Sequence, residues 1–183
     1  MTTTILLVSS ALALGSLPAA AQTPPITRLA PFVASPQNVV EKMLEVANLK
    51  PGETLYDLGS GDGRVLVTAA QRFGAKAVGV EISPKEAKES RDKIARLQLS
   101  EKCSVVEGDL LATDLSPADV VTIYLLTKSN DKLRPNLEKY LKPGARVVSH
   151  DYKIPGWTPK EVVQVEAHRR VHSLYLYEIP ARK

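Results

Sequence analysis

Residues 55–64 read Leu55-Tyr56-Asp57-Leu58-Gly59-Ser60-Gly61-Asp62-Gly63-Arg64, and this stretch decides the fold. An apolar run at 54–58 ends in three glycines at every second position. A helical pattern follows, with these apolar side chains on one face: Val65, Leu66, Ala69, Ala70 and Phe73. Strand, tight turn and helix in this order open a doubly wound α/β sheet, whose ligands bind at the carboxyl ends of the strands. Glycine lets the backbone bend sharply and come close to a ligand.

The spacing of the glycines and one acidic residue indicate the kind of ligand. The dinucleotide fingerprint is G-x-G-x-x-G, but this turn has G-x-G-x-G, and Arg64 stands where the third dinucleotide glycine would be. Asp57, two residues before the first glycine, would repel phosphates. It suits a ligand that carries an ammonium group, such as the methionine part of S-adenosylmethionine (SAM). The alternative is a purely structural turn of another α/β protein.

Two later strands also end near an acid. Residues 77–82 form a predicted buried strand with Glu81 near its end, twenty residues after Gly61. An acid at the end of the second strand of a doubly wound sheet reaches the ribose hydroxyls of an adenosine. A strand predicted over 104–109 ends in Asp109, which is placed to accept a hydrogen bond from an adenine amino group. For Glu81 the alternative is an exposed carboxylate at a strand end.

The rest of the chain completes one domain. A helix is predicted to 48, with Ser35 as its N-cap and Pro36 at its first position, and a charged helix over 84–97. A helix over 130–141 must accommodate Pro135, so its first turn is expected to be a separate piece. The remaining predicted strands are 120–126, 145–149 and an antiparallel hairpin, 162–167 with 171–179. We therefore predict a mostly parallel seven-stranded sheet that ends in this hairpin, with helices on both faces.

Composition limits the partners. The 183 residues carry a net charge of +4, and most charges are scattered as pairs along helices. Aromatic residues make up 5% and are not interleaved with basic ones, as a base-stacking platform requires, so nucleic-acid binding is unsupported. Cys103 is the only cysteine, and neither it nor the three histidines have metal-ligand spacing. We predict no metal site.

The N-terminal residues form a separate segment. The apolar run Ile5–Leu14 is short for a membrane span and is followed by Ala19-Ala20-Ala21-Gln22, a cleavage-type sequence, although residues 1–4 contain no Lys or Arg. Residues 1–21 are a predicted signal peptide or N-terminal anchor, 22–34 a linker or arm, and 35–183 the enzyme domain. Export or membrane attachment conflicts with dependence on SAM, which is made in the cytosol, so localisation stays open.

Several stretches together resemble one family. The glycine turn and the predicted topology resemble class I SAM-dependent methyltransferases. Other stretches resemble, more narrowly, the broad-specificity archaeal protein-lysine methyltransferases and their mitochondrial relatives, which modify inner-membrane carriers and an ATP synthase subunit. These stretches are Pro31-Phe32-Val33-Ala34-Ser35-Pro36, Thr122-Ile123-Tyr124-Leu125-Leu126, Leu133-Arg134-Pro135 and Leu141-Lys142-Pro143-Gly144-Ala145-Arg146-Val147-Val148-Ser149-His150-Asp151.

The resemblance implies a Rossmann-like fold, SAM as cofactor and a protein substrate that presents a lysine. It implies that the cofactor is held by the turn and by the acids at the strand ends: Asp57, Gly59, Ser60, Gly61, Asp62, Gly63, Glu81 and Asp109. Tyr124 would face the methyl acceptor, with core packing as the alternative. His150 and Asp151 would assist proton removal or shape the site, with a structural role as the alternative.

Other functions remain open at this point. The chain lacks the Asn/Asp-Pro-Pro-Tyr/Phe sequence at the fourth strand, which disfavours methylation of adenine or glutamine amides. A SAM methyltransferase for a small molecule or another protein group is one alternative. A non-catalytic SAM-binding domain is another.

Overall fold

The computed structural model describes residue 29 and residues 33–181. Its helices are α1 Gln37–Val46, α2 Arg64–Phe73, α3 Pro84–Arg96 and α4 Thr127–Tyr140. Its strands are β1 Thr54–Leu58, β2 Lys76–Glu81, β3 Cys103–Glu107, β4 Val120–Ile123, β5 Arg146–His150, β6 Glu161–Ala167 and β7 Arg170–Glu178. Within these described ranges, no helix has the length and apolarity needed to cross a membrane.

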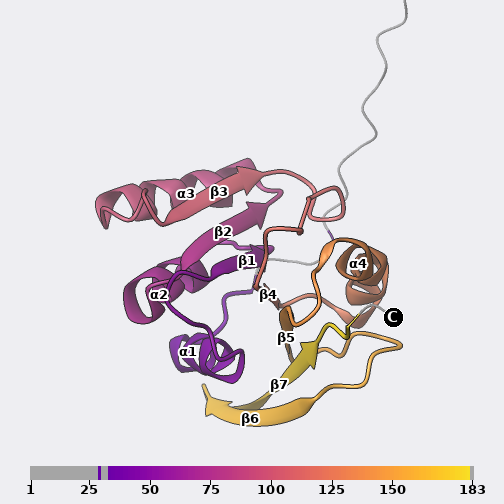
Figure 1. The fold of residues 1–183 in the computed structure, drawn as a ribbon. Coiled ribbons are helices and arrows are strands. Elements are labelled where there is room, and N and C mark those ends of the chain that lie inside the picture. The colour runs from indigo at the N-terminus through magenta and orange to yellow at the C-terminus, as the bar shows by residue number, and fades with distance from the viewer. Residues whose placement is uncertain (1–28, 30–32, 182–183) are drawn as a thin grey trace, which may run out of the picture.

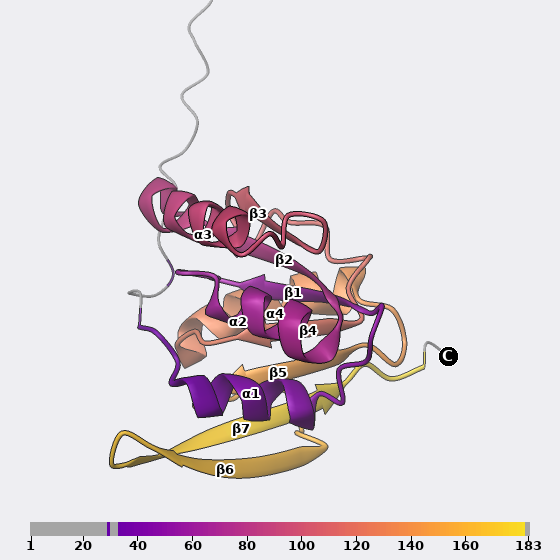
Figure 2. The same ribbon diagram turned by 90° about the vertical axis from the view of Figure 1, so that its left-hand side faces the viewer.

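The seven strands form one sheet in the order β3-β2-β1-β4-β5-β7-β6. The first five are parallel, and β7 pairs antiparallel with both β5 and β6. Figures 1 and 2 show α1, α2 and α3 on one face of the sheet and α4 on the other. The predicted fold class is confirmed, including the closing hairpin at one edge.

Two apolar cores lie on opposite faces of the sheet. One joins α1 and α2 to the sheet through side chains such as Val40, Leu44, Leu66 and Leu174. The other joins α4 to the sheet through Leu133, Leu137, Ile123 and Tyr177. Because both faces are covered, β4 is buried at every residue, as its mostly apolar sequence requires, and Thr122 is its one polar member.

Two predictions about helices are wrong. Pro36, not Ser35, is the N-cap residue of α1, and no side chain caps this helix. The Ser35 hydroxyl instead makes a hydrogen bond with His150, which lies 115 positions away. Pro135 lies inside a continuous α4, so the first turn is not a separate piece. Proline removes one intrahelical hydrogen bond, and burial of Leu133 and Leu137 on either side offsets that cost.

The fourth strand is shorter than the predicted 120–126. β4 ends at Ile123, and Tyr124 is the first residue after it. The predicted signal peptide or anchor at 1–21 lies outside the described residues, as does most of the predicted linker at 22–34.

Candidate active site

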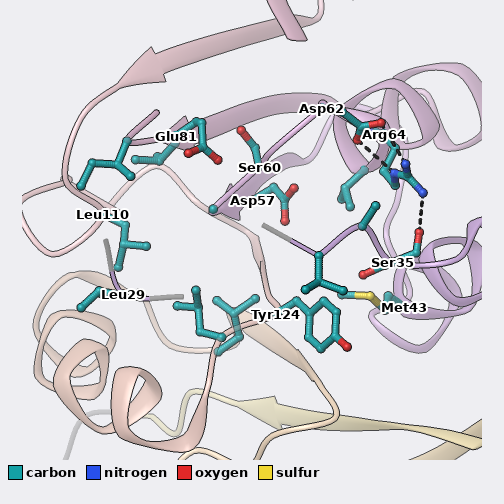
Figure 3. Close-up of a pocket in the computed structure, with 18 of the residues that line it drawn as sticks. Leu29, Ser35, Met43, Asp57, Ser60, Asp62, Arg64, Glu81, Leu110 and Tyr124 are labelled. Carbon is teal, nitrogen blue, oxygen red and sulfur yellow. Dashed lines mark hydrogen bonds and ion pairs between the residues drawn. The ribbon is translucent and has the colours of Figure 1, made fainter. Parts of the chain in front are cut away.

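A cleft opens at the carboxyl ends of the parallel strands β1, β2 and β4 (Figure 3). The polar lining includes four acids, Asp57, Asp62, Glu81 and Asp109. The apolar lining includes Met43, Val65, Val80, Leu110, Ile123 and Leu125. The cleft therefore offers several negative charges within apolar walls.

The glycine turn is fixed by Glu81. One carboxylate oxygen of Glu81 accepts a hydrogen bond from the Gly61 N–H at 2.8 Å, and the other accepts one from the Ser83 N–H at 2.9 Å. The Gly59 N–H donates to the carbonyl of Val80 at 2.8 Å. Gly59 has a φ of 86°, a left-handed conformation that disfavours other residues. The acid at the end of β2 thus holds the turn that follows β1.

Asp57 is the buried acid of the cleft. Its side chain points into the pocket in Figure 3, and the residue is only 6% exposed. The Thr122 hydroxyl donates a 2.7 Å hydrogen bond to Oδ1 of Asp57. The pKa of Asp57 is raised from 3.8 to about 7, chiefly by burial; the hydrogen bond from Thr122 opposes this rise, and the charges of Glu81 and Asp62 contribute to it. A cationic ligand would compensate this buried carboxylate.

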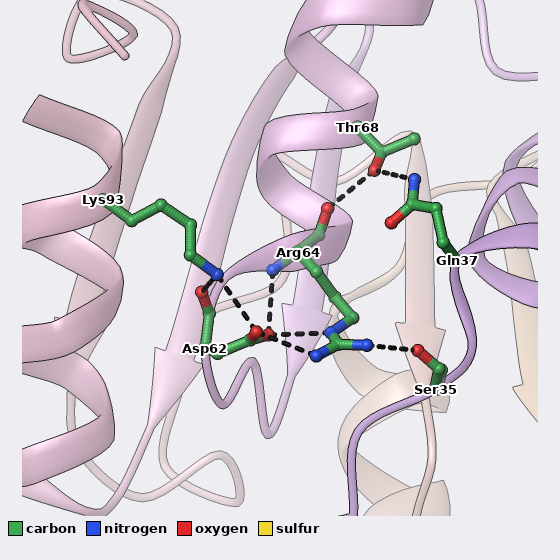
Figure 4. A network of polar contacts seen from close by, with 6 residues as sticks. All are labelled: Ser35, Gln37, Asp62, Arg64, Thr68 and Lys93. Carbon is green, nitrogen blue, oxygen red and sulfur yellow. Dashed lines mark hydrogen bonds and ion pairs between the residues drawn. The ribbon is translucent and has the colours of Figure 1, made fainter. Parts of the chain in front are cut away.

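Asp62 already has basic partners in the protein. Arg64 and Lys93 both form ion pairs with its carboxylate, at 2.9 and 3.0 Å (Figure 4). Burial opposes ionisation, yet these partners lower the pKa of Asp62 to about 2. Arg64 also donates to the carbonyl of Ser35 at 2.7 Å. This network fixes the start of α2 and ties the segment before α1 to it.

The other acids and glycines predicted to bind the cofactor lie at the same end of the sheet. Asp109 lines the cleft, and its Oδ1 accepts a hydrogen bond from the Leu111 N–H at 2.8 Å. Gly61 and Gly63 shape the turn without lining the cleft. The buried Ser60 lines the cleft, and its hydroxyl has no hydrogen-bond partner within the described part of the chain.

The predicted catalytic residues come together beside this cleft. Tyr124 lines it, and its ring stacks on the ring of His150 with centroids 3.8 Å apart. The Tyr124 hydroxyl donates to Oδ2 of Asp151 at 3.2 Å. Burial, and then the charge of Asp151, raise the pKa of Tyr124, so the phenol stays protonated at neutral pH.

Asp151 gathers hydrogen-bond donors from β7. Its Oδ1 accepts a hydrogen bond from the Ser173 N–H at 3.0 Å, while Oδ2 lies 3.2 Å from Nδ1 of His172 and forms an ion pair with Arg170. Burial raises the pKa of Asp151, but these contacts outweigh it and lower the pKa below the ordinary value. Asp151 is therefore a carboxylate at neutral pH.

His150 has a partner at each ring nitrogen. Its Nε2 lies 2.8 Å from Nδ1 of His172, and its Nδ1 lies 2.9 Å from the Ser35 hydroxyl. His150 is fully buried, and burial lowers its pKa, so the ring is neutral at pH 7. The same serine thus links His150, through its side chain, and Arg64, through its carbonyl.

The sequence predicted no metal site, yet the fold brings together three groups that could ligate a metal. Ligand atoms of His150, Asp151 and His172 lie within 4.8 Å of one another. In this structure these atoms make hydrogen bonds with one another, and Arg170 supplies a positive charge to Asp151. The contacts describe a hydrogen-bonded network, and the absence of a metal stays a prediction.

Four residues of the site were missed in the sequence: Ser35 as a side-chain partner, Thr122, Arg170 and His172. Thr122 could have been found, because β1 and β4 are neighbours and Thr122 pairs with Asp57 in the register. His172 is a buried polar residue in β7, a strand whose other buried side chains are mainly apolar. A histidine at such a position is only a weak sequence signal of a role in the site.

Comparison with known proteins identifies this arrangement. The model of the ANTKMT methyltransferase domain matches residues 57–161, which include the glycine turn, Glu81, Tyr124 and the His150–Asp151 pair. The chain belongs to the ANTKMT methyltransferase domain family. The resemblance stated from the sequence is confirmed, and this family member is a SAM-dependent methyltransferase with SAM as its cofactor.

Individual relatives cover most of the domain. A protein-lysine N-methyltransferase of Saccharolobus islandicus is 47% identical over 84% of this chain and 96% of its own length. The adenine nucleotide translocase lysine N-methyltransferase of Mus musculus is 32% identical over 76% of this chain, which spans 60% of that relative. The crystal structure of an RNA methyltransferase from Salinibacter ruber with S-adenosyl-L-homocysteine is 41% identical, with a TM-score of 0.78. That match covers 82% of this chain and 96% of the other.

The cleft of this family member fits SAM on its own chemistry. SAM carries an ammonium, a sulfonium, ribose hydroxyls and an adenine amino group. The cleft supplies a buried carboxylate at Asp57, a second acid at Glu81, a third at Asp109 and the hydroxyl of Ser60, which has no partner among the residues that the structure describes. These acceptors match the cations and hydrogen-bond donors that SAM carries.

Proposed function

We propose that this methyltransferase transfers methyl groups from SAM to lysine side chains of a protein substrate. The observation that carries the proposal is the position of Tyr124. Its phenol lines the cofactor cleft, and its hydroxyl donates a hydrogen bond to Asp151. The 47% identity to a protein-lysine methyltransferase over nearly the whole of that relative supports the same acceptor.

In this proposal each of three acids of the cleft binds a different part of the cofactor. Asp57 binds the ammonium of the methionine end, where Gly59 lets the backbone come close, Ser60 offers its hydroxyl and Gly61 completes the turn. Glu81 accepts hydrogen bonds from the ribose hydroxyls while it holds Gly61. Asp109 accepts one from the adenine amino group. Asp62 and Gly63 contribute by shaping the turn, since Asp62 is paired with Arg64 and Lys93.

The acceptor side suits the neutral amine that attacks the methyl group. An amine attacks in line with the breaking bond to sulfur, so positioning is the main task of the enzyme. A lysine has a free pKa of about 10.4 and must first lose its proton, which apolar surroundings favour. Val33 and Leu125 line the cleft, and Leu126 follows them at the surface. These side chains can pack on the methylene stem of a lysine.

The test uses the protein with methyl-labelled SAM and a mixture of host proteins, with the lysines of one half chemically blocked beforehand. Label in the unblocked half alone supports lysine as the acceptor. Equal label in both halves would refute it in favour of another protein group. Host RNA is added as a third arm, because the Salinibacter ruber relative is described as an RNA methyltransferase. Label in RNA alone would move the assignment to that acceptor.

We further propose that residues 1–21 are a signal peptide or anchor, 22–34 an arm and 35–183 the enzyme domain. The apolar run Ile5–Leu14 and the Ala19-Ala20-Ala21 sequence support this division and a location close to a membrane. Mass spectrometry of the intact protein from its cells tests it. Loss of residues 1–21 indicates a cleaved signal peptide. Full-length protein in the soluble fraction would refute both the signal peptide and the anchor.

A further inference from the structure

We propose that His172 is a positioning residue for methyl transfer. It acts through Asp151 to turn the proton of the Tyr124 hydroxyl away from the cleft, so that the phenol oxygen accepts a hydrogen bond from the incoming amine. The inference rests on the proposed function, since it concerns the amine acceptor, and it assigns a role to a residue that lies outside the cleft lining.

The direction of the Tyr124 proton follows from the charge of Asp151. A carboxylate accepts hydrogen bonds only, and Asp151 is ionised, so the Tyr124 hydroxyl must donate across the 3.2 Å contact. The phenol has one proton, and with this proton on the Asp151 side its remaining lone pairs are available to the cleft. An amine N–H that donates to this oxygen has its own lone pair directed elsewhere, where the methyl group can be attacked.

His172 gives Asp151 a fixed donor. Its Nδ1 lies 3.2 Å from Oδ2 of Asp151 and 2.8 Å from Nε2 of His150. Nε2 of His150 also faces Oδ2 of Asp151, at 3.4 Å, so His172 Nδ1 is the nearer of the two ring nitrogens. We therefore assign the proton to Nδ1 of His172, which shares it between both partners. The neutral His150 then accepts at Nε2 and donates from Nδ1 to the Ser35 hydroxyl. One consistent set of protons thus runs from Ser35 to Tyr124.

Asp151 is also held by its backbone. It has a φ of 61°, an uncommon conformation for a residue other than glycine, although Asp tolerates it better than most. Its N–H donates to the carbonyl of Ser173 at 2.7 Å, and its Oδ1 accepts from the Ser173 N–H. This double contact turns the carboxylate back over β7 toward Tyr124. Unusual backbone conformations of this kind gather at functional sites.

Burial makes His172, rather than Arg170, the determinant. Arg170 also contacts Asp151, but its side chain is 54% exposed, and an exposed ion pair orients its partner weakly. His172 is 5% exposed and lies on β7 between the exposed Val171 and the half-buried Ser173. The His172 ring is therefore fixed by packing and by two hydrogen-bond partners. A fixed ring holds the Asp151 carboxylate in one orientation.

The experiment compares two substitutions of opposite character. His172→Leu introduces an apolar side chain of similar size and removes the Nδ1–H donor. His172→Asn introduces a smaller side chain whose amide can donate from near the place of Nδ1. Initial rates at saturating SAM, the dissociation constant of SAM and the thermal midpoint are measured for each. The acceptor is the host protein that the wild-type enzyme labels most strongly. A role in packing alone would favour leucine, and a role in positioning favours asparagine.

We expect His172→Leu to lower kcat about tenfold, the effect expected when Tyr124 loses its oriented hydrogen bond to the amine, with SAM affinity changed less than about twofold. We expect His172→Asn to recover most of kcat. In a Tyr124→Phe background, His172→Leu should cause no further loss, because the hydroxyl that it positions is already gone. If the leucine variant does not fold, His172→Gln replaces it, because its amide lies nearer the place of Nε2.

Wild-type kcat in His172→Leu would overturn the inference, as would an asparagine variant slower than the leucine variant, or additive losses in the Tyr124→Phe background. These outcomes differ from failure of the proposed function. If the wild-type enzyme labels no lysine, the proposed acceptor is wrong before any His172 variant is compared, and the positioning role for that acceptor is refuted with it.

Discussion

The Thr122 hydroxyl donates a 2.7 Å hydrogen bond to Oδ1 of Asp57, and the two residues are direct partners in the register of β4 and β1. The contact partly satisfies a carboxylate that is otherwise buried. Burial nevertheless dominates and raises the pKa of Asp57 from 3.8 to about 7. A cofactor that brings an ammonium to this site must therefore compete with a proton.

The first prediction is that SAM binding strengthens as the pH rises toward 7. Below this pH Asp57 is protonated in the free protein, and the bound ammonium requires its ionised form, so affinity should rise by up to about tenfold per pH unit between pH 5 and 7. Calorimetric titration of the protein with SAM in buffers of different ionisation enthalpy should also detect proton release. Asp57→Asn should bind weakly and without this pH dependence.

The same group has a consequence for stability that serves as a control without cofactor. Its pKa is raised in the folded protein, so the folded state holds a proton that the unfolded chain has released. The contribution of Asp57 to the free energy of unfolding should therefore fall as the pH rises from about 4 to 7 and then stay level. Denaturation of Asp57→Asn should lack this decline, and an identical decline in the variant would contradict the assignment.

A second prediction concerns Gly79, which lies under the glycine turn. A Cβ at this position would lie 2.5 Å from Oγ of Ser60 and 2.7 Å from Cδ1 of Leu66. Gly79→Ala should lower the free energy of unfolding by about 1–3 kcal/mol through overpacking and weaken SAM binding by displacing Ser60. Gly108→Ala is the matched control for stability alone, because its Cβ would meet nothing within 4 Å but the residue lines the cleft. If urea denaturation shows the two variants to be equally stable, Ser60 and Leu66 do not pack tightly against Gly79 of β2.

A third prediction separates cofactor binding from methyl transfer. Tyr124→Phe keeps the ring that stacks on His150 and removes the hydroxyl that contacts Asp151. Turnover should fall about 10- to 100-fold, as expected for one lost hydrogen bond to the reacting group, with little change in the dissociation constant of SAM. The two quantities are measured by label transfer and by calorimetry. Unchanged turnover would return Tyr124 to a packing role.

The cofactor side of the site could be predicted from the sequence because its parts are local. Asp57 lies near the end of β1 and the three glycines follow that strand directly, while Glu81 and Asp109 lie at or just beyond the ends of the next two strands. Parallel strands place these ends at one edge of the sheet, so their approach follows from the order of strands alone. The glycine spacing and the position of the acids were then sufficient to name the class of cofactor.

The acceptor side could be predicted only in part, because it depends on how distant elements pack. Tyr124 and His150 follow from neighbouring strands, but the approach of His172 to His150 requires the register of β5 against β7. Ser35 was misread as a helix cap, since a serine before a proline fits that local pattern equally well. Its actual partner is 115 positions away, and no local rule relates the two residues.

The last prediction tests Ser35 as the link between the two sides of the site. Its carbonyl accepts from Arg64, and its hydroxyl contacts Nδ1 of the fully buried His150. Ser35→Ala removes only the second contact, so it should leave SAM affinity nearly unchanged. It should lower the free energy of unfolding by about 1–3 kcal/mol, because a buried donor loses its partner.

Turnover of Ser35→Ala should fall less than that of His172→Leu, because Ser35 contacts only His150, whereas His172 lies closer to Asp151, at 3.2 Å, than His150 does, at 3.4 Å. Ser90→Ala is the matched control, since Ser90, like Ser35, is buried, and its hydroxyl has no partner among the residues that the structure describes. It should cost little stability and no turnover. Equal losses of stability in the two serine variants would show that the hydrogen bond to His150 contributes nothing beyond the volume of a hydroxyl group.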